Sequence, residues 1–135
     1  MTAGVAPGLV SGWLNTQRST GNGGAAYNAV AGTFVQLHTA DPGAAGTTAV
    51  SVGDTSRKEI EFAASSAGSA LALDAEPSPW TNGGATETIT HLSVWTAASG
   101  GTFQYSVALT VARDWAEDDE FTLKTLTMAI TPQAS

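Results

Sequence analysis

The sequence predicts an all-β fold, an antiparallel β-sandwich or jelly roll of about seven to eight strands with an N-terminal arm. Apolar residues alternate with polar ones through much of residues 33–135, and segments rich in Gly, Pro and Asp separate these runs. No helical periodicity interrupts the alternation. Short strands between frequent turns are typical of antiparallel sheets, so the pattern favours a sandwich over an α/β fold.

The N-terminal arm, residues 1–32, is rich in Gly, Ala, Ser and Asn. Its isolated apolar anchors are Leu9, Val10, Trp13, Leu14 and Tyr27. The first four are spaced i, i+1, i+4 and i+5, which predicts one face of a short helix within residues 7–19 that ends at the glycines of 21–24. So short a helix is not stable alone. We therefore expect the arm to pack on its own domain, residues 33–135, or to dock on a partner.

Two strands are predicted most clearly. Residues 86–95 are β-branched or aromatic on both faces, as expected of a central strand. The other strand has one apolar face, which is expected to point into a single core and consists of Phe103, Tyr105, Val107, Leu109 and Val111.

Weaker alternation predicts further strands around positions 35–37, 50–52, 60–62 and 71–73. The last apolar segment, residues 121–130, changes its inward phase near Thr125, which predicts a bulge there. Turns are expected at residues 41–46, 76–84, 98–101 and 113–119.

Composition limits the classes of partner. Hydrophobic residues make up 42% of the chain and charged residues only 13%, which suits a protein that meets other subunits over wide areas. The net charge is −7 and no basic cluster is present, which argues against nucleic acid and against anionic membranes. With no cysteine, disulfides and thiolate metal sites are excluded. The N-terminus does not resemble a secretory signal, so the protein is expected in the cytoplasm of the cell that makes it until assembly or lysis.

The residues that could carry chemistry do not form a recognisable site. The acidic group Asp114, Glu117, Asp118, Asp119 and Glu120 offers oxygen ligands, but its spacing does not match a calcium loop, and a solvated turn is expected. His38 and His91, even with Asp41, lack the spacing of a metal or acid–base site. No nucleophile elbow or phosphate loop occurs. We expect no enzymatic activity, no metal and no cofactor.

Two tryptophans leave more than one interpretation open. Trp80 lies in the predicted 76–84 loop and Trp115 in the acidic turn. Each could stack on a sugar or anchor a neighbouring subunit, or it could close an open end of the sandwich. The candidate partner-binding residues are Leu9, Trp13, Leu14, Tyr27, Trp80 and Trp115.

Three segments carry a family resemblance: FVQLHTADPGAAGT (34–47), RKEIEFAAS (57–65) and ETITHLSVWTAASGGTFQYSVAL (87–109). Their order and spacing resemble a family of phage tail-fibre-like and minor virion proteins, over roughly residues 27–131. The resemblance implies structural roles for the matching residues. Leu37 would be a core residue, Pro42 and Gly43 a turn, Ile89 and Trp95 sheet packing, and Gly100 and Gly101 a hairpin.

The resemblance implies a bacteriophage virion structural protein. Because the chain is small and has no long shaft or repeats, our leading hypothesis is a capsid decoration protein on the particle surface. It would act as a homo-oligomer such as a trimer, with the major capsid protein or tail proteins as partners. The alternatives are a minor tail or tail-fibre-associated receptor-binding protein, with residues 76–84 as its binding edge, and a carbohydrate-binding module.

Overall fold

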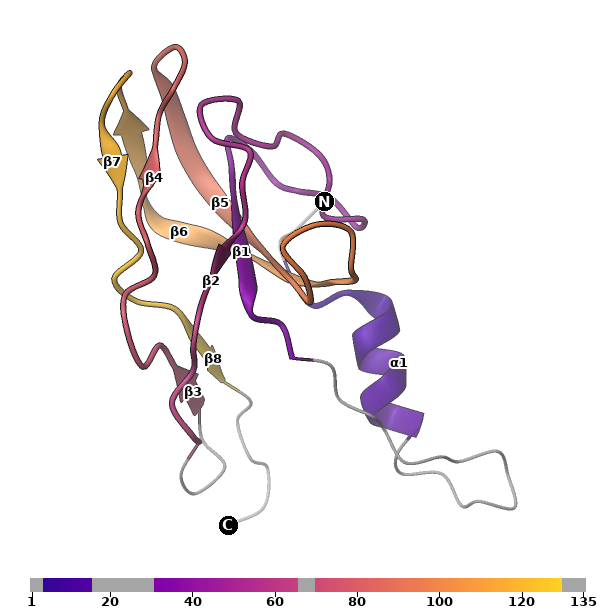
Figure 1. The fold of residues 1–135 in the computed structure, drawn as a ribbon. Coiled ribbons are helices and arrows are strands. Elements are labelled where there is room, and N and C mark those ends of the chain that lie inside the picture. Colours follow the sequence, from indigo (N-terminus) through magenta and orange to yellow (C-terminus); the bar gives the residue numbers. More distant parts are fainter. Residues whose placement is uncertain (1–3, 16–30, 66–69, 130–135) are drawn as a thin grey trace.

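The protein has an all-β fold with one short helix, as predicted. The computed structural model describes residues 4–15, 31–65 and 70–129, and Figure 1 shows their arrangement. The elements are α1 (Pro7–Asn15), β1 (Phe34–His38), β2 (Lys58–Glu59), β3 (Ala70–Ala72), β4 (Trp80–Thr81), β5 (Glu87–Trp95), β6 (Phe103–Trp115), β7 (Glu120–Phe121) and β8 (Thr127–Ala129).

The centre of the molecule is an antiparallel sheet in the order β2-β1-β5-β6. β5 lies inside this sheet, as its two apolar faces predicted, and pairs with β1 from Phe34↔Trp95 to His38↔His91. Two antiparallel ribbons, β3-β8 and β4-β7, form a second layer beside it (Figure 1). The sandwich is therefore formed by one extended sheet and two short ribbons.

The main hydrophobic core lies between these layers. Its buried members are Val35, Leu37, Ile60, Trp80, Ile89, Leu92, Val94, Tyr105, Trp115, Phe121, Leu123 and Leu126. Phe121 of β7 makes edge contacts with two tryptophan rings, at centroid distances of 6.0 Å to Trp80 and 6.4 Å to Trp115. Aromatic rings prefer such edge geometry, and they bury more area than aliphatic side chains. The contact with Trp80 lies within the ribbon, and the contact with Trp115 of β6 packs the ribbon against the sheet.

A second, smaller cluster lies on the opposite face of the sheet and consists of Ala6, Trp95 and Phe103 with Phe34 packed against it. The N-terminal segment covers it. The amide of Ala6 donates to the Gln104 carbonyl at 2.7 Å, and the amide of Ser106 donates to the Gly4 carbonyl at 2.9 Å. The described start of the arm therefore extends the central sheet at the edge of β6.

The single-face prediction for β6 is wrong at its two ends. Register shifts interrupt the β5–β6 pairing, leaving Gln104 as an extra residue and placing residues 109–112 opposite Thr90 alone. The first shift turns Phe103 to the second cluster, and Val111 is 60% exposed. Tyr105 is buried in the main core, and Val107 and Leu109 pack against it. β6 also continues to Trp115, so the turn expected from residue 113 begins later.

The weaker strand predictions are met in part. The run at 50–52 is not a strand, because Val50 forms a single bridge to His38 and Val52 is 76% exposed. β2 ends before the predicted 60–62 pair, although Ile60 is buried in the core. β3 overlaps the predicted 71–73 run.

The C-terminal segment changes phase where the sequence predicted. Phe121, Leu123 and Leu126 are all buried, so the inward parity switches between the last two. The reason is a change of partner, since β7 pairs with β4 whereas β8 pairs with β3. The predicted bulge near Thr125 is thus a break between two strands, and Ile130 lies outside the described residues.

Candidate functional site

His38 has a structural role. It is fully buried, and its Nδ1 donates to the Thr48 carbonyl at 2.8 Å. That tautomer leaves Nε2 as an acceptor for the Ser93 hydroxyl at 2.7 Å, which itself accepts from Nε1 of Trp95 at 2.7 Å. Burial lowers the pKa of His38 below its usual value. The ring is therefore neutral, and its Nδ1 joins β1 to the 39–50 loop while its Nε2 joins β1 to β5.

Arg57 joins two of the segments that carry the family resemblance. Its guanidinium carbon lies 3.7 Å from the ring centroid of Trp95, which is a cation–π contact. Its Nη1 also donates to the carbonyls of Ala97 at 3.0 Å and Gly100 at 2.7 Å. Gly100 and Gly101 have φ values of 63° and 69°, which glycine adopts without strain, so the hairpin is built as the resemblance implied.

The remaining residues of the resemblance also have structural roles. Leu37 and Ile89 are fully buried in the main core, whereas Trp95 packs on the other face of the sheet. Pro42 accepts the amide of Thr48 at 3.0 Å, which closes the predicted turn at Gly43. These residues build the fold and leave no reactive group exposed among them.

The acidic turn after β6 carries exposed carboxylates. Asp114 accepts from the Thr88 hydroxyl at 2.8 Å, and the Asp119 carbonyl accepts from Nε1 of Trp115 at 2.8 Å. Within residues 4–15, 31–65 and 70–129, no group of three or more His, Asp or Glu side chains could hold a metal ion. The Asp41 carboxylate accepts the amide of Gly43 at 2.8 Å, within its own turn.

Trp80 and Trp115 are core residues. Trp80 is fully buried and donates to the Ser56 carbonyl at 3.0 Å, and Trp115 is 2% exposed. Their interpretation as exposed anchors for a sugar or a neighbouring subunit is therefore corrected. Trp80 lies in β4, which pairs with β7, and Phe121 of β7 makes edge contacts with both rings, so the two tryptophans pack inside the sandwich.

Sequence reasoning missed Asn82. Its side chain is fully buried and donates to the carbonyls of Trp115 at 2.8 Å and Ala85 at 3.2 Å, while its Oδ1 accepts from Gly84 at 2.9 Å. The sequence offered only a turn signal here, the Asn-Gly-Gly run. Asn82 fixes the end of β6 against the loop after β4, which is a structural task.

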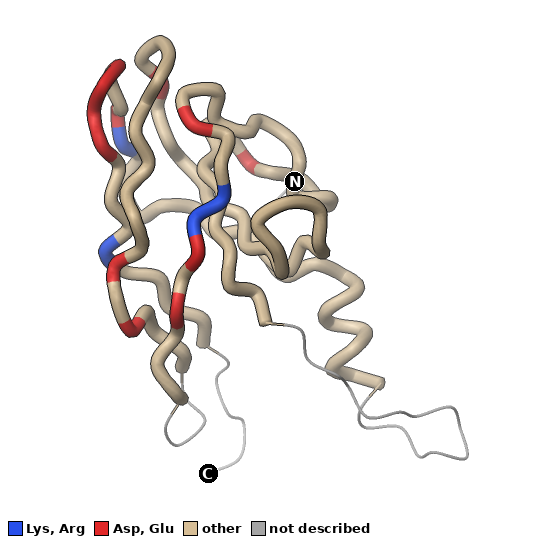
Figure 2. The backbone as a smooth tube through the Cα atoms, viewed as in Figure 1, with Lys and Arg blue, Asp and Glu red and all other residues tan. Residues whose placement is uncertain are grey.

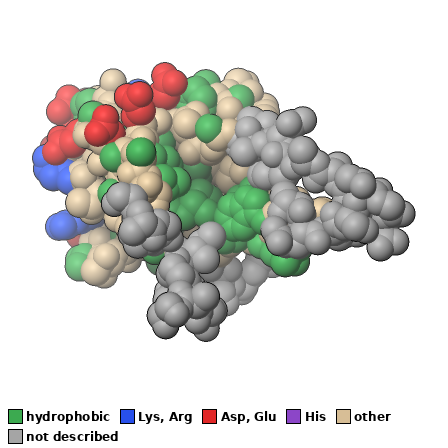
Figure 3. Space-filling view, turned by 90° about the horizontal axis from the view of Figure 1, so that it is seen from below, with side chains coloured by type: hydrophobic (Ala, Val, Ile, Leu, Met, Phe, Trp, Pro, Cys, Tyr) green, Lys and Arg blue, Asp and Glu red, His purple; other side chains and the backbone are tan. Residues whose placement is uncertain are grey.

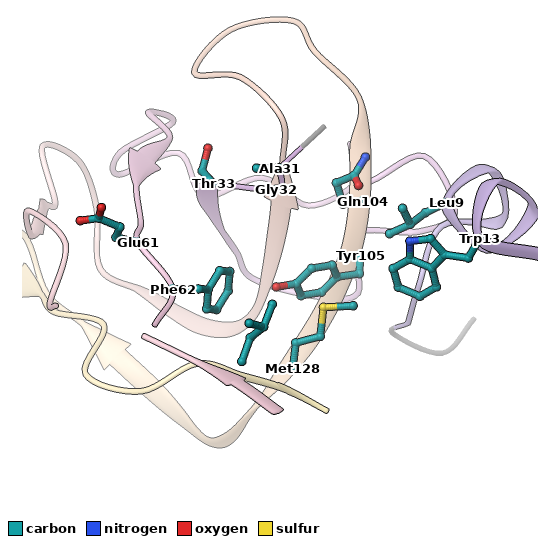
Figure 4. Close-up of a pocket in the computed structure, with 11 residues that line it drawn as sticks. Leu9, Trp13, Ala31, Gly32, Thr33, Glu61, Phe62, Gln104, Tyr105 and Met128 are labelled. Atoms are coloured by element: carbon teal, nitrogen blue, oxygen red, sulfur yellow. The ribbon is translucent and has the colours of Figure 1, made fainter. Parts of the chain in front are cut away.

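One apolar cavity of about 430 Å³ lies between α1, the central sheet and the β3-β8 ribbon. It is lined by Leu9, Trp13, Ala31, Gly32, Thr33, Glu61, Phe62, Leu71, Gln104, Tyr105 and Met128. Figure 4 shows the side chains of α1 on one side, Phe62 on the other and the Tyr105 ring between them. Cavities of this size and character are typical binding sites for apolar groups.

The hydroxyl of Tyr105 is the notable polar atom of this cavity. The residue is only 8% exposed, and among the described residues its hydroxyl has no hydrogen-bond partner. Burial raises the pKa of Tyr105 to about 12, so the hydroxyl is protonated at neutral pH and available as a donor. A buried donor without an acceptor is unfavourable, and this hydroxyl is shut off from solvent.

The predicted anchors of the arm divide between the cavity and the surface. Leu9 is buried and Trp13 is half-buried, and both line the cavity. Leu14 is 65% exposed and Val10 is 38% exposed. Tyr27 lies outside the described residues.

Charge is distributed unevenly over the molecule. The acidic side chains lie on the sandwich and its loops, whereas α1 carries no charged residue (Figure 2). Seen from below, apolar side chains gather in the middle of the face and charged ones lie toward one edge (Figure 3). No helix in the described part of the chain is long and apolar enough to cross a membrane.

Comparison with protein families identifies the chain. A profile described as podophage GP4 fiber I protein gp80 matches residues 15–131. This span contains every strand of the fold. The chain belongs to the podophage fiber I protein family. A search of curated proteins gave no match.

Membership of the fiber I family gives the protein a class. It is a phage virion structural protein of a tail-fibre-like family. This agrees with the virion role predicted from the sequence. The match begins at Asn15, the last residue of α1, so the rest of the helix precedes the span that matches the fiber I family.

Proposed function

We propose that this protein is a fibre-associated structural subunit of a podophage tail and has no enzymatic activity. The observation that carries the proposal is the match to the fiber I family over residues 15–131, which includes both layers of the sandwich. A tail role is therefore preferred to our earlier hypothesis of capsid decoration. The small size that favoured decoration is equally compatible with a module that joins a larger fibre.

The side-chain chemistry supports a structural role. His38 is buried with both ring nitrogens bonded, and Asn82 and Arg57 are used to fix loops. Catalysis needs groups that can reach a substrate with a suitable protonation state. The side chains of His38, Asn82 and Arg57 instead form their hydrogen bonds within the protein.

A glycan-binding role loses its main support. That hypothesis relied on Trp80 as an exposed stacking surface at the 76–84 loop, and Trp80 is fully buried. Aromatic stacking on sugars requires an accessible ring face. We therefore do not carry this alternative further.

The experiment that tests the proposal counts and locates the protein in purified virions. Quantitative mass spectrometry against the major capsid protein gives the copy number, and immunogold electron microscopy gives the position. We expect a small copy number and label at the tail. Hundreds of copies with label over the head would overturn the tail assignment in favour of decoration.

A further inference from the structure

We propose that Asn82 is a latent site of spontaneous deamidation, which the folded protein keeps closed and which opening of the β4-β7 ribbon exposes. Once Asn82 has been converted to aspartate or isoaspartate, the site cannot close again. The reaction needs only water, and it gives the fold a chemical property that is separate from its role as a structural subunit.

The sequence makes Asn82 chemically labile, because Gly83 and Gly84 follow it. In an unfolded chain the backbone nitrogen of Gly83 can attack Cγ of the Asn82 side chain and form a five-membered imide. The new bond joins N to Cγ, the bond from Cγ to Nδ2 breaks, and Nδ2 leaves as ammonia with the proton of the Gly83 amide. Water then opens the imide at either carbonyl, which gives aspartate or isoaspartate. A following glycine favours the attack, because it has no Cβ to obstruct the approach and adopts more backbone conformations than other residues.

In the fold, each reacting group of Asn82 and Gly83 is held by another partner. The nucleophile, the amide of Gly83, donates to the Gly53 carbonyl at 2.9 Å. The leaving group, Nδ2 of Asn82, donates to the Trp115 carbonyl at 2.8 Å, and Oδ1 accepts from the amide of Gly84 at 2.9 Å. The side chain is fully buried, which also keeps water away from it. These bonds must break before the imide can form, so the reaction follows an opening of the fold.

The contact that holds the Gly83 amide is itself fixed by Glu87. The Glu87 carboxylate accepts from the amide of Gly53 at 3.0 Å and from the hydroxyl of Ser51. A Cβ added at Gly53 would collide with Oδ1 of Asn82, so this loop is packed directly against the labile side chain. Residues 51–54 therefore cover the Asn82–Gly83 peptide, and Glu87 holds the cover in place.

Conversion of Asn82 removes the bonds that close the site. Aspartate has no N–H to donate to the Trp115 carbonyl, and it would bring a negative charge to a fully buried position that faces this oxygen. Isoaspartate also adds a methylene group to the backbone, at a residue whose amide and carbonyl bond to Asp119 and Asp118. A chain that stays open long enough to react is therefore prevented from refolding.

The first measurement compares the rate of deamidation in the folded and the unfolded full chain. Both samples are kept at mildly alkaline pH, one in buffer and one in concentrated guanidinium chloride, and peptide mapping by mass spectrometry follows the conversion. The chain contains its own standard, because Asn22 is also followed by two glycines and tryptic cleavage after Arg57 and Lys58 separates the two sites. We expect similar rates at both sites in guanidinium, and a rate at Asn82 lower by about a hundredfold or more in buffer.

Two results of this comparison would overturn the proposal. One is an equal rate at Asn82 in buffer and in guanidinium, which would mean that the fold does not close the site. The other is an Asn82 that stays intact in guanidinium while Asn22 is converted.

The second measurement loosens the cover. Glu87→Ala removes the acceptor for the Gly53 amide and should raise the rate at Asn82 in buffer by about tenfold or more. Glu87→Gln keeps an oxygen acceptor and should restore most of the protection. Asp114→Ala is the matched control, because this carboxylate accepts from the Thr88 hydroxyl, outside the 51–54 loop. Equal rates in Glu87→Ala and Asp114→Ala would contradict the role of the cover.

The parent in sub-denaturing guanidinium gives the same comparison without a substitution, should Glu87→Ala fail to fold. The rate of deamidation at Asn82 should then rise together with hydrogen exchange at the Gly83 amide, since both require the bond to Gly53 to open. A deamidation rate that is independent of this exchange would overturn the proposal.

The last measurement tests whether the converted site can close. Asn82→Asp should lower the melting temperature by about 10 °C or more, or prevent folding. Asn15→Asp makes the same chemical change at an exposed side chain and should have a much smaller effect. An Asn82→Asp variant that melts like the parent would contradict the irreversible step.

Discussion

His38 couples protonation to folding at the scale of a single residue. Burial lowers its pKa in the folded protein relative to an ordinary value of 6.5. The unfolded chain then binds the proton more readily, so stability is fully present above pH 6.5 and declines as the pH falls below it, toward the folded pKa. Chemical denaturation between pH 7.5 and 5.5 should show this decline.

The variant that checks this assignment is His38→Gln. It should be less stable than the parent at pH 7.5, because the bond to Ser93 or Thr48 is disturbed, but its stability should change less over the same pH range. His91→Gln serves as the comparison, because it leaves the bonds of His38 in place and removes only a smaller contribution to its lowered pKa than burial. An equal pH slope in His38→Gln and the parent would show that another group causes the decline.

Arg57 is the second residue whose removal has a definite expected effect. Arg57→Ala loses the contact with Trp95 and two bonds to the 97–100 backbone, which should lower the free energy of unfolding by about 1–3 kcal/mol. Arg57→Lys keeps the charge but not the planar group, so it should recover only part of the loss. Urea denaturation measures both. Full recovery by Lys would contradict the stacking argument.

At the scale of the element, β6 provides a matched pair of substitutions. Val107 packs against the main core, whereas Val111 is 60% exposed after the register shift. Val107→Asp should destabilise the protein by about 3 kcal/mol or more, and Val111→Asp by about 0.5 kcal/mol or less. Thermal melting of the two variants checks the register. Similar losses at both positions would mean that β6 keeps one face throughout.

The acidic segment 117–120, which ends at the first residue of β7, should contribute little to stability. Its carboxylates are exposed, and such groups have weak interactions with their surroundings. Replacing Glu117, Asp118, Asp119 and Glu120 together by Gln and Asn should change the melting temperature only slightly. Asn also tolerates the positive φ of 65° at Asp118. A melting temperature that rises sharply with calcium in the parent but not in the variant would identify a metal site.

The elements were predictable to different degrees from their own sequence. β5 and the Gly100–Gly101 hairpin followed from local pattern, because β-branched residues and paired glycines act within a few positions. The face of Val111 did not, since a register shift depends on the partner strand. The burial of Trp80 was missed for a similar reason, because its strand partner Phe121 lies 41 positions away in the chain.

At the scale of the whole molecule, the N-terminal segment is part of the sandwich. Ala6 is buried against Trp95 and Phe103, so Ala6→Asp should lower stability by about 2 kcal/mol or more. Gly4→Ala is the control, because a Cβ there meets no atom within 4 Å. Differential scanning calorimetry compares them. An unchanged melting temperature in Ala6→Asp would show that residues 4–6 act only as an arm.

The cavity could not be predicted from the sequence. Leu9 and Trp13 were recognised as anchors on one helical face, but Phe62, Tyr105 and Met128 come from three separate segments. Only the folded chain brings these side chains together. The unpartnered hydroxyl of Tyr105 likewise depends on what surrounds it in space, whereas the sequence showed only an aromatic residue on a strand.

The central sheet buries different chemistry on its two faces. Val35 and Leu37 face the main core, whereas Gln36 and His38, which alternate with them, are buried on the other side. A slip of one residue in the register would exchange the two faces. Polar side chains would then enter the apolar core, and apolar side chains would leave the polar groups of the other face without hydrogen-bond partners. The register of the strands is therefore specified by both faces of the sheet. We expect this to protect the chain from pairing with a neighbour's strands when many copies fold close together, since a foreign strand must match both faces.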